Sequence, residues 1–275
     1  SGLMWLLLAG ALAALQPARR LALLLLAFAV GVGFYQHVLT WPVLTLLAGT
    51  GVLAALRLWH PAPSRRHRLS EALLVVIAVG LFLHLFPGFD NPRQVDEVRA
   101  GAQSVPFSFS FNFDKALVPF VLLAALPTLF RAPAHPPRFR WLSALALIAA
   151  VPLLLGSAVL PGGLAIEPHF PPWLGAFVLA NLFFVSLAEE ALFRGYLQQR
   201  LREALGGMPA LLLSALLFGL AHAPGGVLLV IFATLAGGLY GLAWHWSGRL
   251  WLATLLHFAL NLTHLLLFTY PALQH

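Results

Sequence analysis

Four side chains in the last third of the chain have residue types and a spacing suited to hydrolysis: Glu189, His222, His257 and Asn261. A carboxylate and an imidazole can hold a water molecule between them, and the carboxylate can take its proton as a general base. A second imidazole with an amide on one helix face can donate hydrogen bonds to a developing oxyanion. Together these groups would hydrolyse a peptide bond without a covalent intermediate.

The same residues leave a metal mechanism open. Catalytic zinc commonly takes His and Glu ligands and keeps one position free for water. Glu189, His222 and His257 would supply such a set. The chain has no cysteine, which excludes a thiolate metal site and a cysteine nucleophile. At this point the residues allow either a site with no cofactor or, as the alternative, a site that holds Zn²⁺.

The composition of the 275 residues places these groups in a membrane protein. Hydrophobic residues make up 60% of the chain and charged residues only 9%, whereas a soluble domain carries about 25% charged residues. Lipid must therefore solvate much of the apolar surface. The net charge of +7 comes from few basic residues, so it reports membrane topology and does not indicate nucleic-acid binding.

Apolar segments of roughly membrane-spanning length recur along the chain. They cover residues 3–16, 21–36, 42–59, 71–87, 115–130, 141–160, 173–197, 209–223, 227–246 and 250–269. The first is short, so the expected number of spans is nine or ten. The expected fold is an all-α polytopic transmembrane bundle. Its N-terminal transmembrane region covers 1–172, and its catalytic core, the last four spans, covers 173–275.

Basic residues indicate which side of the membrane each loop faces. If the spans alternate, 13 arginines, Arg138 among them, fall on one side, and only Arg93, Arg99 and Lys115 fall on the other. The richer side should be cytoplasmic. The Leu, Ala, Arg and Pro bias suggests a bacterial cytoplasmic (inner) membrane. Arg57, near a span end, is expected to snorkel to the surface.

The longest break, 88–114, falls on the non-cytoplasmic side. Within it phenylalanine alternates with other residues from Phe107 to Phe113. A period of two indicates an extended segment with one aromatic face. Such a face would anchor in the membrane interface or cover a groove.

Spacing brings three of the polar residues, Glu189, His222 and His257, to a similar depth. The chain turns near Gly206, and Glu189 and His222 lie about 17 residues before and after that turn. In an antiparallel helix pair, two residues at the same sequence distance from the turn lie at the same level. His257 lies eight residues into its span from Arg249. At 1.5 Å per residue, the site is then roughly 12 Å below the cytoplasmic surface.

Helical periodicity separates the neighbouring glutamates. Glu190 and Arg194 are four residues apart, so they share a face and can pair. That pairing would neutralise both groups. Glu189 points about 100° away and is left free to act. His257 and Asn261 are also four apart and share a face.

These motifs resemble a known family. Glu189-Glu-x-x-x-Arg194, Phe218-x-x-x-His222 and His257-x-x-x-Asn261, in this order over about 173–265, are similar to those of the CPBP family. That family contains the CAAX prenyl endopeptidases, bacteriocin-processing enzymes and Abi-type proteins. The glycine-rich segment 236–241 resembles the family's glycine-bearing helix, where small residues permit close packing.

The resemblance implies an all-helical, glutamate-dependent intramembrane protease. Glu189 and His222 would activate water, and His257 and Asn261 would stabilise the oxyanion. Glu190, Arg194 and Phe218 would support them. An asparagine suits an oxyanion hole better than a zinc shell, which favours the metal-free mechanism. The substrate would be a membrane protein or peptide within the lipid bilayer.

Two other functions compete with proteolysis. A proton-coupled transporter also uses buried Glu and His, but such proteins favour internal repeats, and we find no repeat. A non-catalytic membrane scaffold could have the same fold, and fold alone does not separate these functions.

Overall fold

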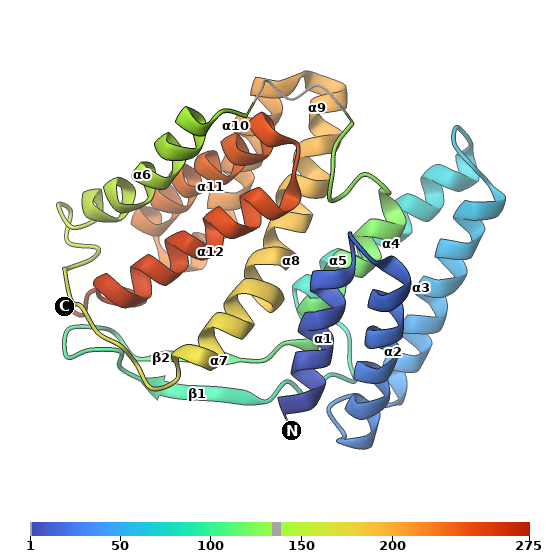
Figure 1. Ribbon diagram of the computed structural model, residues 1–275, viewed down its shortest axis with the longest axis horizontal. Helices are drawn as coiled ribbons and strands as arrows, with labels where there is room; N and C mark the ends of the chain where they lie inside the picture. Colours follow the sequence, from blue (N-terminus) through green and yellow to red (C-terminus); the bar gives the residue numbers. More distant parts are fainter. Residues whose placement is uncertain (1, 134–138) are drawn as a thin grey trace.

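The computed structural model describes residues 2–133 and 139–275, and within them the chain is mainly helical (Figure 1). Arg138, one of the 13 arginines assigned to the cytoplasmic side, lies outside the described residues. A helix covers each of the ten predicted apolar segments. They are α1 (Gly2–Ala14), α2 (Arg19–Tyr35), α3 (Trp41–Trp59), α4 (Arg65–Phe82), α5 (Phe113–Ala125), α6 (Trp141–Ser157), a long helix over Leu174–Leu205, α10 (Gly207–Leu220), α11 (Val227–Ser247) and α12 (Leu250–Leu267).

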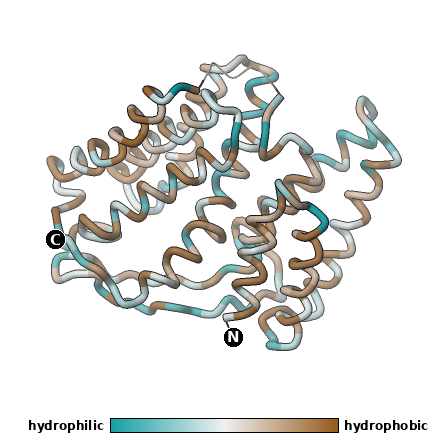
Figure 2. The backbone as a smooth tube through the Cα atoms, in the orientation of Figure 1, coloured by the Kyte–Doolittle hydropathy of each residue, from teal (hydrophilic) through white to brown (hydrophobic). Residues whose placement is uncertain are grey.

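Four of these helices are long and apolar enough to cross a membrane: α3, the long helix Leu174–Leu205, α11 and α12. Hydrophobic residues run along most of the helices (Figure 2), and many large aliphatic side chains face outward, such as Leu24, Leu153 and Leu212. Outward apolar surface of this kind requires lipid as the solvent. The prediction of an all-α, multi-pass integral membrane protein is confirmed.

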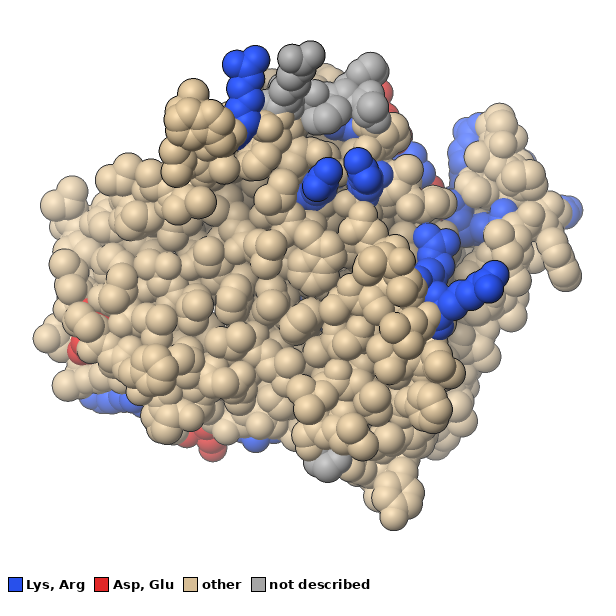
Figure 3. Space-filling view, in the orientation of Figure 1, with Lys and Arg blue, Asp and Glu red and all other residues tan. Residues whose placement is uncertain are grey.

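The two ends of the bundle differ in charge. On the visible face, most Lys and Arg side chains gather at the end that holds α9 and at the α3–α4 turn (Figures 1 and 3). The strands and both chain termini lie toward the opposite end (Figure 1). This separation is the pattern expected from the loop charges. The assignment of the basic end to the cytoplasm stays a prediction.

The long helix is not a regular α-helix. It comprises α7 (Leu174–Leu179), η1 (Ala180–Ser186), α8 (Leu187–Glu190), η2 (Ala191–Gln198) and α9 (Gln199–Leu205), and η1 and η2 are π-helical. A π turn holds one extra residue and rotates the side chains that follow it. The one α-helical turn between the two π segments carries Glu189 and Glu190. Wide turns of this kind are frequent at functional sites.

The predicted turn at Gly206 is present. Gly206 has a φ of 89°, a left-handed conformation that glycine adopts without a steric penalty. It reverses the chain between α9 and α10. A 3-10 turn, η3 (Ala223–Gly225), follows α10 directly after His222. The two arms of this hairpin hold Glu189 and His222, as the spacing predicted.

The N-terminal helices pack directly against the long helix. Trp5 of α1 contacts Phe184 of η1 with ring centroids 5.5 Å apart, and it also contacts Phe111. One cluster of buried apolar side chains extends from Met4 to Leu250. The packed core therefore continues across residues 172 and 173. The division into 1–172 and 173–275 stays a prediction from sequence.

Arg57 does not snorkel, so that expectation is wrong. Its side chain is buried, 7% exposed, and donates hydrogen bonds to the Ala125 carbonyl at 2.7 Å and to Ser70 at 3.1 Å. Glu71 of α4 lies 3.6 Å away. Glu71 also pairs with Arg200 of α9 and accepts a hydrogen bond from Tyr196. This buried network ties α3, α4 and α5 to the long helix, which is why the guanidinium points inward.

The phenylalanine-rich break forms a β-hairpin. β1 (Arg93–Val98) pairs antiparallel with β2 (Phe107–Ser110), with Arg93 opposite Ser110 and Val98 opposite Phe107. The extended conformation was predicted correctly. Phe107 and Phe109 pack against Trp173 and Phe177 at the start of the long helix. The aromatic face thus covers the end of the bundle.

Two adjacent glycines on α11 should differ sharply in tolerance to alanine. A Cβ on Gly237 would lie 2.8 Å from Arg194 Nη2 and 3.0 Å from Phe218, whereas a Cβ on Gly238 would meet nothing within 4 Å. We expect Gly238→Ala to raise the stability by up to about 1 kcal/mol through helix propensity. Gly237→Ala should lower it, because Arg194 must move. Thermal unfolding midpoints in detergent test this, and equal midpoints for the two variants would contradict the close packing.

Candidate active site

His257 of α12 lies between the two neighbouring glutamates. Its Nδ1 donates a hydrogen bond to Glu190 Oε2 at 2.9 Å, and its Nε2 lies 4.0 Å from Glu189 Oε2. A carboxylate can only accept, so Nδ1 must carry a proton. The ring stacks on Tyr240 of α11 with centroids 4.4 Å apart and an interplanar angle of 13°. Tyr240 and Glu190 therefore fix the plane and the direction of the imidazole.

Glu190 and Arg194 form the predicted pair. Arg194 Nη1 donates to Glu190 Oε2 at 3.3 Å, and both side chains are 0% exposed. Arg194 also donates to the Gly237 carbonyl at 2.7 Å, and its guanidinium lies 4.6 Å from the centroid of Phe218. This buried pair links α8 and η2 to α11 and, through His257, to α12.

Glu189 differs from Glu190 in both exposure and contacts. Its side chain is 14% exposed, and within the described ranges its carboxylate accepts no hydrogen bond and forms an ion pair with His257 alone. A gap of 4.0 Å is too long for a direct hydrogen bond, but a water molecule can bridge groups separated by such a distance. Glu189 is therefore the carboxylate of the pair that is available to a water molecule or a substrate.

His222 lies two residues after the end of α10 and is held by a hydrogen bond to that helix. Its Nδ1 bonds the Phe218 carbonyl at 2.8 Å; a carbonyl only accepts, so Nδ1 donates and Nε2 stays available in the neutral ring. In the parts of the chain that are described, no hydrogen bond joins His222 to Glu189. Phe218 lies between the two histidines, with its ring centroid 4.9 Å from His222 and 5.9 Å from His257.

Asn261 lies one helical turn beyond His257 and contacts a residue that the sequence reading missed. Asn261 Nδ2 donates to Asn181 Oδ1 at 3.0 Å, and Ser186 Oγ donates to the same oxygen at 3.1 Å. Asn181 and Ser186 belong to η1, the π segment before Glu189. The sequence reading searched apolar spans for ionisable side chains. A search for any polar side chain would have found Asn181.

Tyr240 is the second missed residue. It is 1% exposed and lies within the glycine-rich segment of α11 that was interpreted as a packing motif. Close approach of that segment to α10 and η2 is what brings the phenol ring onto His257. Nothing in the spacing of Tyr240 along its own helix indicates this partner.

Tyr270, directly after α12, borders the site from the hairpin end. Burial, and to a smaller extent the Glu189 carboxylate, raises the pKa of Tyr270 above its ordinary value. The phenol therefore stays neutral at physiological pH and can donate or accept a hydrogen bond. Its ring packs edge-on against Phe107 with centroids 4.9 Å apart.

The three possible zinc ligands do not form a metal-binding cluster. Over residues 2–133 and 139–275 no group of three His, Asp or Glu side chains is arranged to hold a metal ion. His257 uses Nδ1 on Glu190 and His222 uses Nδ1 on its own helix, which leaves Nε2 of each ring as the nitrogen that could bind a metal. A zinc site would require these two Nε2 atoms and the Glu189 carboxylate to converge on one point; the metal-free mechanism stays a prediction.

The fold and the site together define a helical membrane protein with a buried centre of carboxylate and imidazole groups. Residues 171–263 match the family model described as Type II CAAX prenyl endopeptidase Rce1-like. No curated protein and no solved structure matches the chain significantly. The segment that carries the candidate site is thus similar to the Rce1-like CAAX endopeptidases, and the predicted resemblance to CPBP and CAAX proteases is confirmed for residues 171–263.

The buried Glu190–Arg194 pair should be strongly coupled. Arg194→Met leaves Glu190 with one partner fewer in a dry core and should cost about 3–5 kcal/mol of stability. Glu190→Gln leaves Arg194 uncompensated and should also destabilise. The double variant should lose less than the sum of the two, measured by thermal unfolding in detergent.

The matched control is the exposed pair Arg93–Asp96, whose side chains are 57% and 74% exposed. Asp96→Asn should change stability by less than about 1 kcal/mol. Additive losses for Glu190→Gln and Arg194→Met would show that the two side chains do not act as a unit.

Proposed function

We propose that the protein is an intramembrane endopeptidase that hydrolyses a peptide bond of a membrane-associated protein or peptide with water activated at Glu189. One observation carries this proposal. Of two adjacent glutamates, Glu190 is buried and bonded to both Arg194 and His257, whereas Glu189 is partly accessible and only 4.0 Å from His257 Nε2. One carboxylate positions the histidine, and the other is left to act as the base.

In the first step, Glu189 takes a proton from water as the hydroxide attacks the scissile carbonyl carbon. His222, whose Nε2 is available, orients that water with Glu189. The tetrahedral intermediate carries its negative charge on the former carbonyl oxygen. In the second step, the protonated Glu189 gives its proton to the departing amine nitrogen, and the carbon–nitrogen bond breaks. Atoms and charge balance without a covalent enzyme intermediate.

The oxyanion is stabilised by His257 and Asn261. Because Nδ1 of His257 is committed to Glu190, donation from Nε2 requires a proton on both ring nitrogens. In that state the positive charges of Arg194 and His257 balance the negative charges of Glu189 and Glu190. Donors that are fixed before the reaction lower the barrier most in a site that excludes water. Asn181 positions Asn261 by accepting its amide proton.

The proposed setting is a bacterial cytoplasmic membrane, with the basic loops on the cytoplasmic side. The buried charges of the N-terminal helices do not favour a transporter, because Arg57 and Glu71 form a fixed network with Arg200. Peptide cleavage by the wild type and its loss in the variant described next would distinguish a protease from a transporter and from a non-catalytic scaffold.

Glu189→Gln should abolish cleavage while the protein still folds. A lost general base costs about 10²–10⁴-fold in rate. We would compare newly formed peptide termini in membranes of cells that produce the wild type or the variant, and then measure cleavage of the precursor so identified by the purified proteins. Glu203→Gln, at a 53% exposed side chain near the α9–α10 turn, is the control and should cleave normally. Full activity of Glu189→Gln would overturn the mechanism.

Chelation separates the two mechanisms of hydrolysis. If no metal takes part, 1,10-phenanthroline and EDTA should leave the rate unchanged, and the active protein should contain far less than one zinc per chain by elemental analysis. Inactivation by a chelator that added Zn²⁺ reverses would instead restore the zinc alternative.

A further inference from the structure

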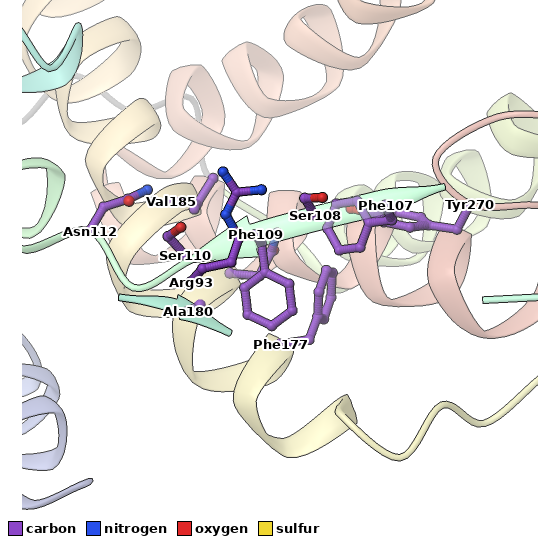
Figure 4. A pocket seen from close by; sticks show the side chains of 11 residues that line it. Arg93, Phe107, Ser108, Phe109, Ser110, Asn112, Phe177, Ala180, Val185 and Tyr270 are labelled. Atoms are coloured by element: carbon purple, nitrogen blue, oxygen red, sulfur yellow. The ribbon is translucent and has the colours of Figure 1, made fainter. Parts of the chain in front are cut away.

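A cavity of about 390 Å³ lies between the β-hairpin and the first turns of the long helix (Figure 4). This volume falls in the range of ligand-binding pockets. In Figure 4 the rings of Phe109 and Phe177 lie side by side, and Phe107 extends toward Tyr270. The mechanism proposed above uses none of these four aromatic side chains.

The floor of the cavity continues into the candidate active site. Ala180, Asn181 and Val185 of η1 line it. Asn181 holds Asn261, and Val185 precedes Glu189 by four residues on the same long helix. A chain that lies in the cavity therefore reaches the groups that would stabilise the oxyanion. The cavity is at the hairpin end of the bundle, opposite the basic end (Figures 1 and 3).

The outer edge of β2 is unpaired above this cavity. The C-terminal tail pairs with the segment just before β2, where Val105 N donates to the Ala272 carbonyl at 3.1 Å and Gln274 N donates to the Gln103 carbonyl at 2.9 Å. In the described residues no backbone hydrogen bond joins this tail to β2 itself. Within the described chain, Phe107–Ser110 makes backbone ladder bonds only to β1. A free edge of this kind is a template for an added strand.

The polar groups of the cavity favour a peptide over a lipid chain. Ser110, Asn112 and Asn181 line the cavity. In the described residues the side chains of Ser110 and Asn112 form no hydrogen bond, and Asn181 uses only its Oδ1, as an acceptor. An acyl chain would desolvate these groups without pairing them, which is costly. An extended peptide can bond them through its backbone while it places apolar side chains on Phe107 and Phe109.

We propose that this cavity binds an extended segment of the substrate as an added strand along β2 and leads it from the non-cytoplasmic side toward Asn181 and Asn261. This inference rests on the proposed function and names its substrate class: a membrane protein or peptide with an extended stretch that carries apolar side chains on the face toward the aromatic residues.

The chain has no native cysteine, so a single reporter is simple to introduce. We would place the fluorophore bimane on Ser110→Cys in the full-length Glu189→Gln protein in lipid nanodiscs, and titrate it with the peptide acetyl-Leu-Ser-Leu-Ser-Leu-Ser-amide. The expected result is a saturable change in bimane emission. Gln94→Cys, at an exposed position of β1 that does not line the cavity, is the control and should not respond.

A matched peptide tests strand addition itself. Methylation of alternate backbone nitrogens keeps every side chain but removes donors, and should weaken binding about ten-fold, as expected for the loss of one or two hydrogen bonds. Equal binding of both peptides would overturn strand addition. An equal, competing response to oleic acid would assign the cavity to an acyl chain instead, and no saturable response at Ser110→Cys would exclude the site.

Failure of this inference is distinguishable from failure of the proposed function. Binding needs no catalysis, so a peptide response in the Glu189→Gln protein supports the cavity even if the wild type cleaves nothing. Conversely, cleavage of a precursor by the wild type without any response at Ser110→Cys would support the proposed protease function and contradict the proposed docking site.

Discussion

The arrangement of the catalytic core depends on keeping charge paired where water is scarce. Glu190 is fully buried and receives hydrogen bonds from Arg194, on its own helix, and from His257, on α12. Arg194 in turn reaches the backbone of Gly237 on α11. Removal of one partner from such a buried pair leaves an uncompensated charge, so these helices cannot shift independently. The hydrogen bond from His257 to Glu190 also sets the direction of the His257 imidazole.

The two π segments allow one helix to direct polar side chains toward different partners. Asn181, Glu189 and Glu190 must reach different partners on α12: the amide of Asn261 and the two sides of His257. Each extra residue in a π turn rotates the following side chains. The α-helical turn at Leu187–Glu190 is flanked by one such segment on each side. A long helix of 32 residues can thereby present polar groups to the site while its other faces pack on lipid or on α1 and α5.

The N-terminal helices and the hairpin extend the core on the side where it would otherwise face lipid or water. Trp5 packs on Phe184, and Glu71 pairs with Arg200, so the long helix is held near both of its ends. The hairpin covers the start of the same helix with Phe107 and Phe109. Three parts of the chain that are distant in sequence thus pack along the helix that carries Glu189.

The amino-acid sequence by itself determined the features that depend on local spacing. The helical segments, the turn at Gly206, the Glu190–Arg194 pair and the shared face of His257 and Asn261 all follow from composition and from a period of 3.6 residues. Only the tertiary structure decided which side chains meet across helices. Periodicity says which face a residue occupies, but not which helix that face meets. For that reason the contact of His257 with Glu190, the stacking of Tyr240, the bond of Asn181 to Asn261 and the inward direction of Arg57 came from packing.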